Sequence, residues 1–300
     1  MSPSLITEFV VLAALWGASF LFMHVGAAEF GALPTAGLRV CLAALFLLPV
    51  FLVRGVWKDF RRRMRPILFA GLLNSALPFA LYCYAVMHID TGLSAILNAT
   101  VPLSGAVVAW LWLKDKPSGL RSLGLAVGFV GVALLVIGKS GTPGASAATA
   151  DRLTTLVAMG ACLLATVCYG VAASFTKRYL SGVQPLATAA GSQIGAALGL
   201  AIPTLWFWPT QPVSHTAWLA IAAVALLCTS VAYILFFHII EVAGPAKALT
   251  VTFLVPVFAA VYGTVFLGES ITPWTMVCGA VIFLGTALST GLLSMRAAPG

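Results

Sequence analysis

Two Val-Pro pairs, each deep inside a long apolar run, are the residues of this sequence best suited to bind a small molecule. Asn98 precedes Pro102 by four positions, and Thr252 precedes Pro256 by the same spacing. A proline has no N–H and its ring crowds the carbonyl four residues earlier, so each pair predicts an interrupted helix. Asn98, Thr252 and the freed carbonyls could hydrogen-bond the polar group of a ligand. Alternatively, a neighbouring helix or the residue's own side chain could satisfy each interruption.

Asn74, Pro78 and Tyr82 follow one another at intervals of four, so they stack on one face of a helix. Pro78 frees the carbonyl of Asn74 in the same way. Aromatic residues within apolar runs could form the walls of a cavity for an apolar side chain with a polar head, although membrane helices also use them for packing. The candidate substrate-binding residues are Asn98, Pro102, Thr252, Pro256, Asn74, Pro78, Tyr82, Trp16, Tyr169 and Tyr233.

Arg39 is a cation about five residues inside the apolar stretch 34–53. A charge within a membrane span is expensive and points to a functional site by default. Arg39 could attract the carboxylate of a substrate. Because it lies near one end of its stretch, it could instead reach the lipid headgroups or brace the helix ends. We favour a gating or structural role.

The interior of the apolar runs offers no arrangement of residues typical of catalysis or metal binding. No Asp or Glu lies in the middle of a run, and the six cysteines show no CxxC spacing. We expect no catalytic residue, no metal and no cofactor, and hence no enzyme. An intramembrane lipid-modifying enzyme, the alternative from another class, would need a convergent set of nucleophile, base or metal ligands. A receptor or a channel is a further alternative function.

The composition is that of an integral membrane protein. Hydrophobic residues make up 61% of the 300 residues, and charged residues make up 8%, whereas a soluble domain has about 25% charged residues. A membrane-spanning helix needs about 20 apolar residues. We therefore predict an all-α membrane protein with ten transmembrane helices, at about 5–25, 34–53, 66–87, 92–113, 120–138, 153–176, 185–206, 216–239, 246–267 and 273–294.

The basic residues predict the orientation of the chain. Thirteen Lys and Arg follow even-numbered spans and only two, Lys139 and Arg152, lie on the opposite side. The excess of positive charge marks the cytoplasmic side, so both termini are expected to be cytoplasmic, in the bacterial inner (plasma) membrane. The net charge of +8 is therefore a topology signal, and we expect the lipid bilayer and a small molecule as partners, with no nucleic acid.

The two halves of the chain match each other at an offset of 154 residues. Laying 92–134 on 246–288 gives eleven identities in 43 positions, and the same offset pairs Arg39 with Gln193. Because this offset contains five spans, an odd number, the second half must enter the membrane with the opposite orientation. The fold class that follows is two inverted five-helix repeats.

The repeats are 1–145 and 146–300, within a single transmembrane domain. Pro102 and Pro256 lie about ten residues into their spans, or ~15 Å at 1.5 Å per residue, which places both near the membrane midplane. Small-residue ridges at 124–131 and 191–199 could form a dimer interface, but packing inside the bundle is favoured. The expected state is a monomer or weak homodimer.

The sequence resembles the EamA-type exporters of the drug/metabolite transporter superfamily, and within it the aromatic amino-acid exporter branch. The residues that carry the resemblance are Leu15-Trp16-Gly17-Ala18-Ser19-Phe20, Arg39, the frame Pro256…Leu267-Gly268-Glu269…Gly279…Gly285, and its looser copy Pro102…Leu113-Lys114-Asp115…Gly131. The resemblance implies a ten-helix bundle that works by alternating access and exports metabolites or amino acids.

We expect a secondary transporter or facilitator that exports small neutral or aromatic amino acids or related metabolites through a central midplane cavity. Efflux of amphipathic toxic compounds is the alternative within transport. Proton-driven drug antiporters of the superfamily depend on an intramembrane Glu, which this chain does not offer. We therefore expect poor recognition of organic cations and weak or absent proton coupling.

Overall fold

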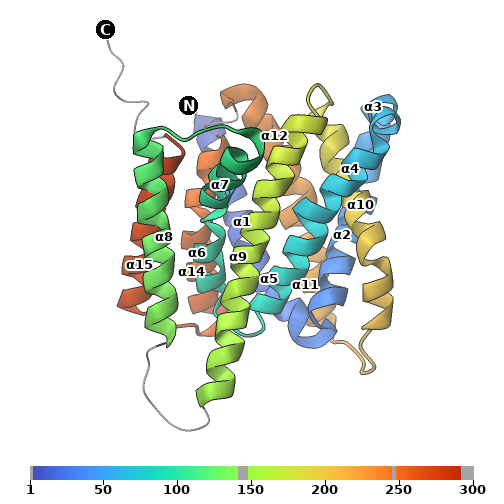
Figure 1. Cartoon of the computed structure of the whole chain (residues 1–300). Coiled ribbons are helices and arrows are strands. Elements are labelled where there is room, and N and C mark those ends of the chain that lie inside the picture. Colours follow the sequence, from blue (N-terminus) through green and yellow to red (C-terminus); the bar gives the residue numbers. More distant parts are fainter. Residues whose placement is uncertain (1–2, 141–147, 245–247, 292–300) are drawn as a thin grey trace.

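The computed structural model describes residues 3–140, 148–244 and 248–291, and the regular elements in these ranges are all helical. Long helices run up and down in one bundle (Figure 1). The all-α prediction is confirmed, whereas the predicted boundary between 145 and 146 lies outside the described residues. The elements are α1 Pro3–Phe30, α2 Ala32–Val53, α3 Trp57–Arg62, α4 Met64–Gly71, η1 Leu72–Ala76, α5 Leu77–Ala85, α6 Thr91–Asn98, α7 Val101–Leu113, α8 Gly119–Ser140, α9 Ala148–Tyr179, α10 Pro185–Trp206, α11 His215–Ala225, η2 Leu226–Val231, α12 Ala232–Ala243, η3 Thr250–Phe253, α14 Val255–Leu267 and α15 Pro273–Ser289.

Nine helical stretches of the described residues are long and apolar enough to cross a membrane. They correspond to the first nine predicted spans, with four of them composed of two or three consecutive elements. The tenth prediction, 273–294, corresponds to α15, which is apolar but has 17 residues. The first helix is longer than the predicted 5–25, because α1 continues to Phe30.

Both predicted helix interruptions are present. The first separates α6, which ends at Asn98, from α7, and Pro102 lies in the first turn of α7. In the second half, η3 is a short 3₁₀ turn and Pro256 lies in the first turn of α14. A proline is well accommodated in a first turn because no helical bond is lost there.

Two spans contain a π-helical turn. In the first, η1 ends two residues before Pro78, which cannot donate a helical bond. The second, η2, contains no proline; here the hydroxyls of Thr229 and Ser230 donate to the carbonyls of Val224 and Ala225, five residues earlier. The start of η2 lies 154 residues after that of η1. Such turns are rare and occur frequently at functional sites.

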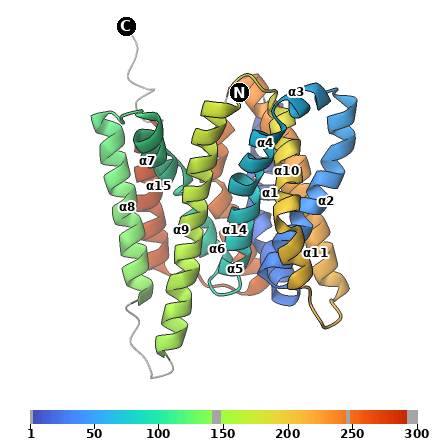
Figure 2. The same ribbon diagram turned by 45° about the vertical axis from the view of Figure 1, so that its right-hand side comes forward.

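Small residues hold the helices together inside the bundle. The two helices α8 and α15, which begin 154 residues apart, lie side by side at one edge (Figures 1 and 2). Gly124 of α8 lies against the backbone of Gly285 and Ser289 in α15. Likewise, Gly195 of α10 lies against the backbone of Leu68 in α4. These contacts confirm the prediction that both glycine ridges pack internally.

Candidate functional site

An aromatic and polar group lies beside the interruption between α6 and α7. The Tyr82 hydroxyl of α5 donates to the Oδ1 atom of Asn98 at 2.9 Å. Tyr82 stacks with Tyr169 of α9, with ring centroids 6.4 Å apart, and meets Phe20 of α1 edge to face at 5.7 Å. Three of the four side chains come from helices of the first half and Tyr169 comes from the second. The arrangement combines π surfaces with one amide, which suits a ligand with an apolar ring and a polar head.

A second polar group is centred on Gln193 of α10, which is completely buried. Its Nε2 atom donates to the Ser75 hydroxyl at 2.9 Å and lies 3.4 Å from the Tyr233 hydroxyl. The side chains of Asn74 and Ser75 also interact with the Tyr233 hydroxyl. The Oε1 atom of Gln193 has no hydrogen-bond partner among the described residues. This leaves one buried acceptor within the group.

Arg39 of α2 is buried between helices, with 5% of its surface exposed. Its Nε atom donates to the Thr229 hydroxyl at 3.0 Å, and its Nη1 atom donates to the sulfur of Met23 at 3.1 Å. The guanidinium carbon lies 3.6 Å from the centroid of the Phe79 ring. The idea that Arg39 reaches the lipid headgroups was therefore wrong, because its head is enclosed by α1, α5 and η2.

The contacts of Arg39 and Gln193 correspond to each other. Arg39 contacts Phe79 in its own half and Thr229 in the other; Gln193 contacts Tyr233 in its own half and Ser75 in the other. Each member of the first set lies 154 residues from its counterpart in the second: 39 and 193, 79 and 233, 75 and 229. Both hydroxyl acceptors lie in the π turns η1 and η2.

The other candidate residues are more dispersed. The Thr252 hydroxyl donates to the carbonyl of Leu249 in its own helical turn at 2.8 Å. Trp16 of α1 packs against Phe236 of α12, with ring centroids 5.1 Å apart. Pro78 and Pro256 are buried, and Pro102 is half-buried. The structure thus brings Tyr82, Asn98 and Tyr169 together and places Asn74 beside Tyr233. Thr252 bonds within its own helical turn, whereas Trp16 also packs against the buried cluster that contains Phe20 and Tyr82.

Carboxylates connect the two halves at one end of the bundle, which we call the distal end because it lies opposite the start of α1 (Figure 1). Glu269, which follows α14, accepts from the backbone N–H and the hydroxyl of Thr91, both at 2.8 Å, and from the N–H of Gly92 at 3.4 Å. Glu29 accepts from the N–H of Ser214 at 2.7 Å and from its hydroxyl at 2.6 Å. Both sets connect the first half with the second.

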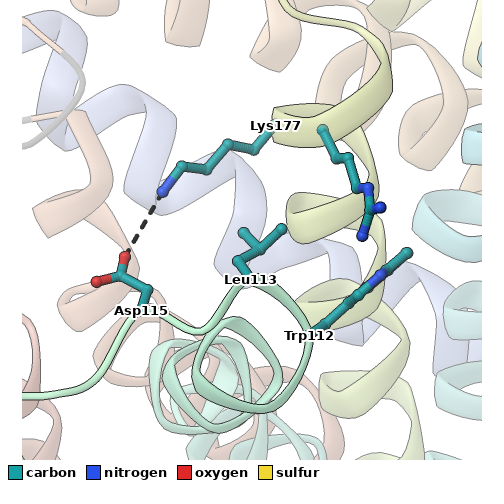
Figure 3. Close-up of a pocket in the computed structure, with 5 residues that line it drawn as sticks. Trp112, Leu113, Asp115 and Lys177 are labelled. Atoms are coloured by element: carbon teal, nitrogen blue, oxygen red, sulfur yellow. Dashed lines mark ion pairs between the residues drawn. The ribbon is translucent and has the colours of Figure 1, made fainter.

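The opposite, proximal end carries a shallow, open surface depression lined by Trp112, Leu113, Asp115, Lys177 and Arg178. Lys177 of α9 reaches toward Asp115, which follows α7, and their charged atoms are 3.5 Å apart (Figure 3). Both side chains are more than half exposed, and an exposed pair of this kind contributes little stability. A second contact between the halves at this end joins Glu8 and His238 at 2.7 Å. In the described ranges, no group of three or more His, Cys, Asp or Glu could hold a metal ion.

Sequence reasoning missed several of these residues. Ser75, Phe79 and Thr229 were not selected, although the 154-residue offset that pairs Arg39 with Gln193 also pairs Ser75 with Thr229. Glu269 appeared only in the frame that carries the family resemblance, and no role was assigned to it. Its sequence signal was the 154-residue offset that pairs Leu267-Gly268-Glu269 with Leu113-Lys114-Asp115.

The chain is similar in sequence to several bacterial transporters. It is 27% identical to the uncharacterized transporter YvbV of Bacillus subtilis over 90% of this chain and 85% of that protein. It is 26% identical to the uncharacterized inner membrane transporter YedA of Escherichia coli K12, over 96% and 91% of the two chains. A protein of Streptantibioticus cattleyicolor named "Probable terminal-alkyne amino-acid exporter" is 24% identical over 93% and 91%.

The fold is also found in a solved protein crystal structure, which superposes with a TM-score of 0.66 and 19% sequence identity and covers 99% of this chain and 100% of the other. That likeness concerns the fold alone. The model of the EamA-like transporter family matches residues 5–137 and 156–291, which together make up most of the chain. The protein is therefore an integral membrane protein that belongs to the EamA-like transporter family.

Proposed function

We propose that this protein is a secondary transporter or facilitator that exports small neutral or aromatic amino acids, or related metabolites, by alternating access. The observation that carries the proposal is the meeting of Tyr82, Asn98 and Tyr169 beside an interrupted membrane helix. In hydrocarbon, an interruption is tolerated only next to protein or a wet cavity, and transporters place their substrates at such breaks. The ring of the substrate would lie against the tyrosines, and the polar group of the substrate would form a hydrogen bond with the side-chain amide of Asn98.

The architecture that this mechanism needs is two inverted five-helix repeats that form ten spans, with α15 as the tenth. The corresponding contacts of Arg39 and Gln193 support it, because an inverted pair of repeats makes each contact between the halves twice. The matched π turns η1 and η2 support it independently. The two halves would then rock against each other at these turns. The basic residues favour cytoplasmic termini, and we propose a monomer or weak homodimer in the plasma membrane.

The described conformation is one state of the proposed cycle. Glu269 and Glu29 join the two halves at the distal end, while the proximal end has an open depression beside Trp112 and Lys177. With cytoplasmic termini, the proximal end would face the cytoplasm, and the contacts at the distal end would close the pathway to the outside. A substrate would enter from the cytoplasm in this state and leave after the distal contacts break.

The substrate class rests on two considerations. The aromatic group beside Asn98 suits an apolar or aromatic side chain, and the S. cattleyicolor relative is named as an amino-acid exporter. The resemblance to the aromatic amino-acid exporter branch points the same way. Efflux of amphipathic toxic compounds is distinguished by a competition panel, since it predicts inhibition by hydrophobic cations and drugs with no preference for amino acids.

Replacing Asn98 by Ala should lower transport about tenfold, because one hydrogen bond to the substrate is lost together with the partner of Tyr82. Counterflow of labelled phenylalanine and leucine into proteoliposomes measures this change. Thr252→Val is the matched control: its hydroxyl already bonds the carbonyl of Leu249, so a change of less than about threefold is expected. Normal transport by Asn98→Ala would contradict the site, and a protein without counterflow for any amino acid would contradict the function.

Transport should not be driven by a proton gradient. The eight acidic residues of the chain lie near span ends or in loops, and none belongs to the Tyr82 or Gln193 groups. Without a titrating carboxylate in the pathway, protonation has no means of changing the substrate affinity of one state relative to the other. We expect equal initial rates of amino-acid uptake into proteoliposomes at matched pH and with an imposed gradient of two pH units. Strong uphill uptake under the gradient would refute this expectation.

A further inference from the structure

Arg39 carries a charge that its packing role does not require. Among the buried residues that the structure describes, Arg39 is the only charged one. At the corresponding position, neutral Gln193 likewise donates to a hydroxyl in the π turn of the other half, and it donates to the hydroxyl of Tyr233, the counterpart of Phe79. Bracing the two halves therefore needs a hydrogen-bond donor at these positions, and an amide is sufficient.

The charge is also unmatched. The partners of Arg39 are a hydroxyl, a thioether and an aromatic ring, all of them neutral. None of the carboxylates in the described ranges forms an ion pair with it. A buried cation without a counter-ion is strongly unfavourable, and removing water from it makes an incoming anion bind more tightly.

One donor of the guanidinium stays available. Nε and Nη1 have partners, whereas Nη2 has no hydrogen-bond partner among the described residues. Arg39 as a whole keeps 5% of its surface exposed. A carboxylate oxygen at this nitrogen would form a charge-assisted hydrogen bond and neutralise the cation.

Arg39 lies near both groups of the candidate site. Its neighbours Met23 and Phe79 belong to the same buried cluster as Phe20 and Tyr82. Tyr169 of the Asn98 group and Tyr233 of the Gln193 group both interact electrostatically with the guanidinium. A ligand whose ring lies against the tyrosines can therefore bring a carboxylate to Arg39.

We propose that Arg39 binds the carboxylate of the transported substrate, so that the protein selects small monocarboxylates, such as amino acids, over the matching amides and amines. This inference rests on the proposed transport function and names its substrate chemistry. It revises the structural or gating role expected from the sequence. The Nε atom of Arg39 links the two halves through Thr229, as Gln193 does through Ser75, and the positive charge recognises the substrate.

The test compares L-phenylalanine with L-phenylalaninamide and phenethylamine, which lack the carboxylate. Each compound competes with labelled phenylalanine for counterflow, and each is also assayed for thermal stabilisation of the purified protein in detergent. The wild type should prefer the acid by at least about tenfold, the size of one charge-assisted hydrogen bond. Arg39→Gln, which copies the chain's own Gln193, should reduce this ratio to about one.

Thr229→Val is the matched control, because it removes the acceptor of the brace and leaves the charge in place. Its ratio should stay at the wild-type value. A ratio that survives in Arg39→Gln overturns the proposal. If Thr229→Val abolishes the preference for the acid, whether or not Arg39→Gln does so too, the preference depends on the hydrogen bond between Arg39 and Thr229. That outcome also overturns the proposal.

Three further outcomes are decisive. If the wild type shows no preference for phenylalanine over its amide and amine, the inference is overturned without any variant. The inference also fails if replacing gluconate by chloride in the buffer stabilises the protein while the acid is not preferred. If no acid undergoes counterflow through the wild type, the proposed transport function fails. The stabilisation ratio in detergent then still decides whether Arg39 binds a carboxylate.

Discussion

Gly285→Leu should lower the stability of the protein by about 3 kcal/mol or more, at the severe end of the range for overpacked sites. A Cβ atom at Gly285 would lie closer than 3.0 Å to backbone atoms of both Gly128 and Gly124 in α8. Backbone cannot rotate away as the end of a side chain can, so α8 and α15 would have to separate. Loss of this contact removes the packing on which adjacent membrane helices depend.

The measurement is the apparent melting temperature of purified protein in detergent, for which we expect a decrease of roughly 10 °C. Gly160→Leu is the matched control. Gly160 also lies in a helix, but it is exposed, and a Cβ atom added there has no neighbouring atom within 4 Å. It should melt within about 2 °C of the wild type. Equal melting of Gly285→Leu and Gly160→Leu would show that α8 and α15 are not in contact.

Glu269→Ala should shift the equilibrium between the closed and open states of the distal end toward the open state by about 2–3 kcal/mol. The reason is that Thr91 and Gly92 lose a charged acceptor of three hydrogen bonds. That change corresponds to a roughly 30- to 150-fold shift toward the open state. Hydrogen–deuterium exchange in nanodiscs measures it. Faster exchange is expected in the first turn of α6 and also around Ser214, whose contact with Glu29 is chemically unchanged.

The two regions distinguish a gate from a helix cap. If exchange rises only at Thr91 and Gly92, Glu269 merely caps α6 and the halves stay closed. Asp115→Ala is the matched control, since Asp115 follows α7 as Glu269 follows α14, 154 residues later. Among the described residues, its carboxylate pairs only with the exposed Lys177, so a change below about 0.5 kcal/mol is expected.

The comparison of Asp115 with Glu269 also bears on how the transporter would alternate. Both residues bond their own backbone N–H to a carbonyl six positions earlier, Ala109 and Gly263, so the local fold is repeated. Their carboxylates differ, because only that of Glu269 connects to the start of a helix in the other half. A rocking motion that exchanged these environments would open the distal end and close the proximal one.

The sequence by itself determined the local backbone and the family. Pro102 and Pro256 predicted the helix interruptions correctly, and Pro78 marked a break where the structure has a π turn. These features follow from sterics within about four residues of a proline, so no distant contact is needed to predict them. Apolar length likewise located the spans, because a helix must cross a hydrocarbon layer of fixed thickness.

Only the tertiary structure decided which polar groups meet. Asn98 and Thr252 occupy the same place in the two halves, yet one accepts from Tyr82 and the other bonds its own helical turn. Arg39 lies 190 residues from Thr229, its hydrogen-bond partner. In a membrane helix the faces toward lipid and toward protein are both apolar, so hydrophobic periodicity does not show which side chains point inward. The rotation of each helix, and with it the site, is set by close packing against its neighbours.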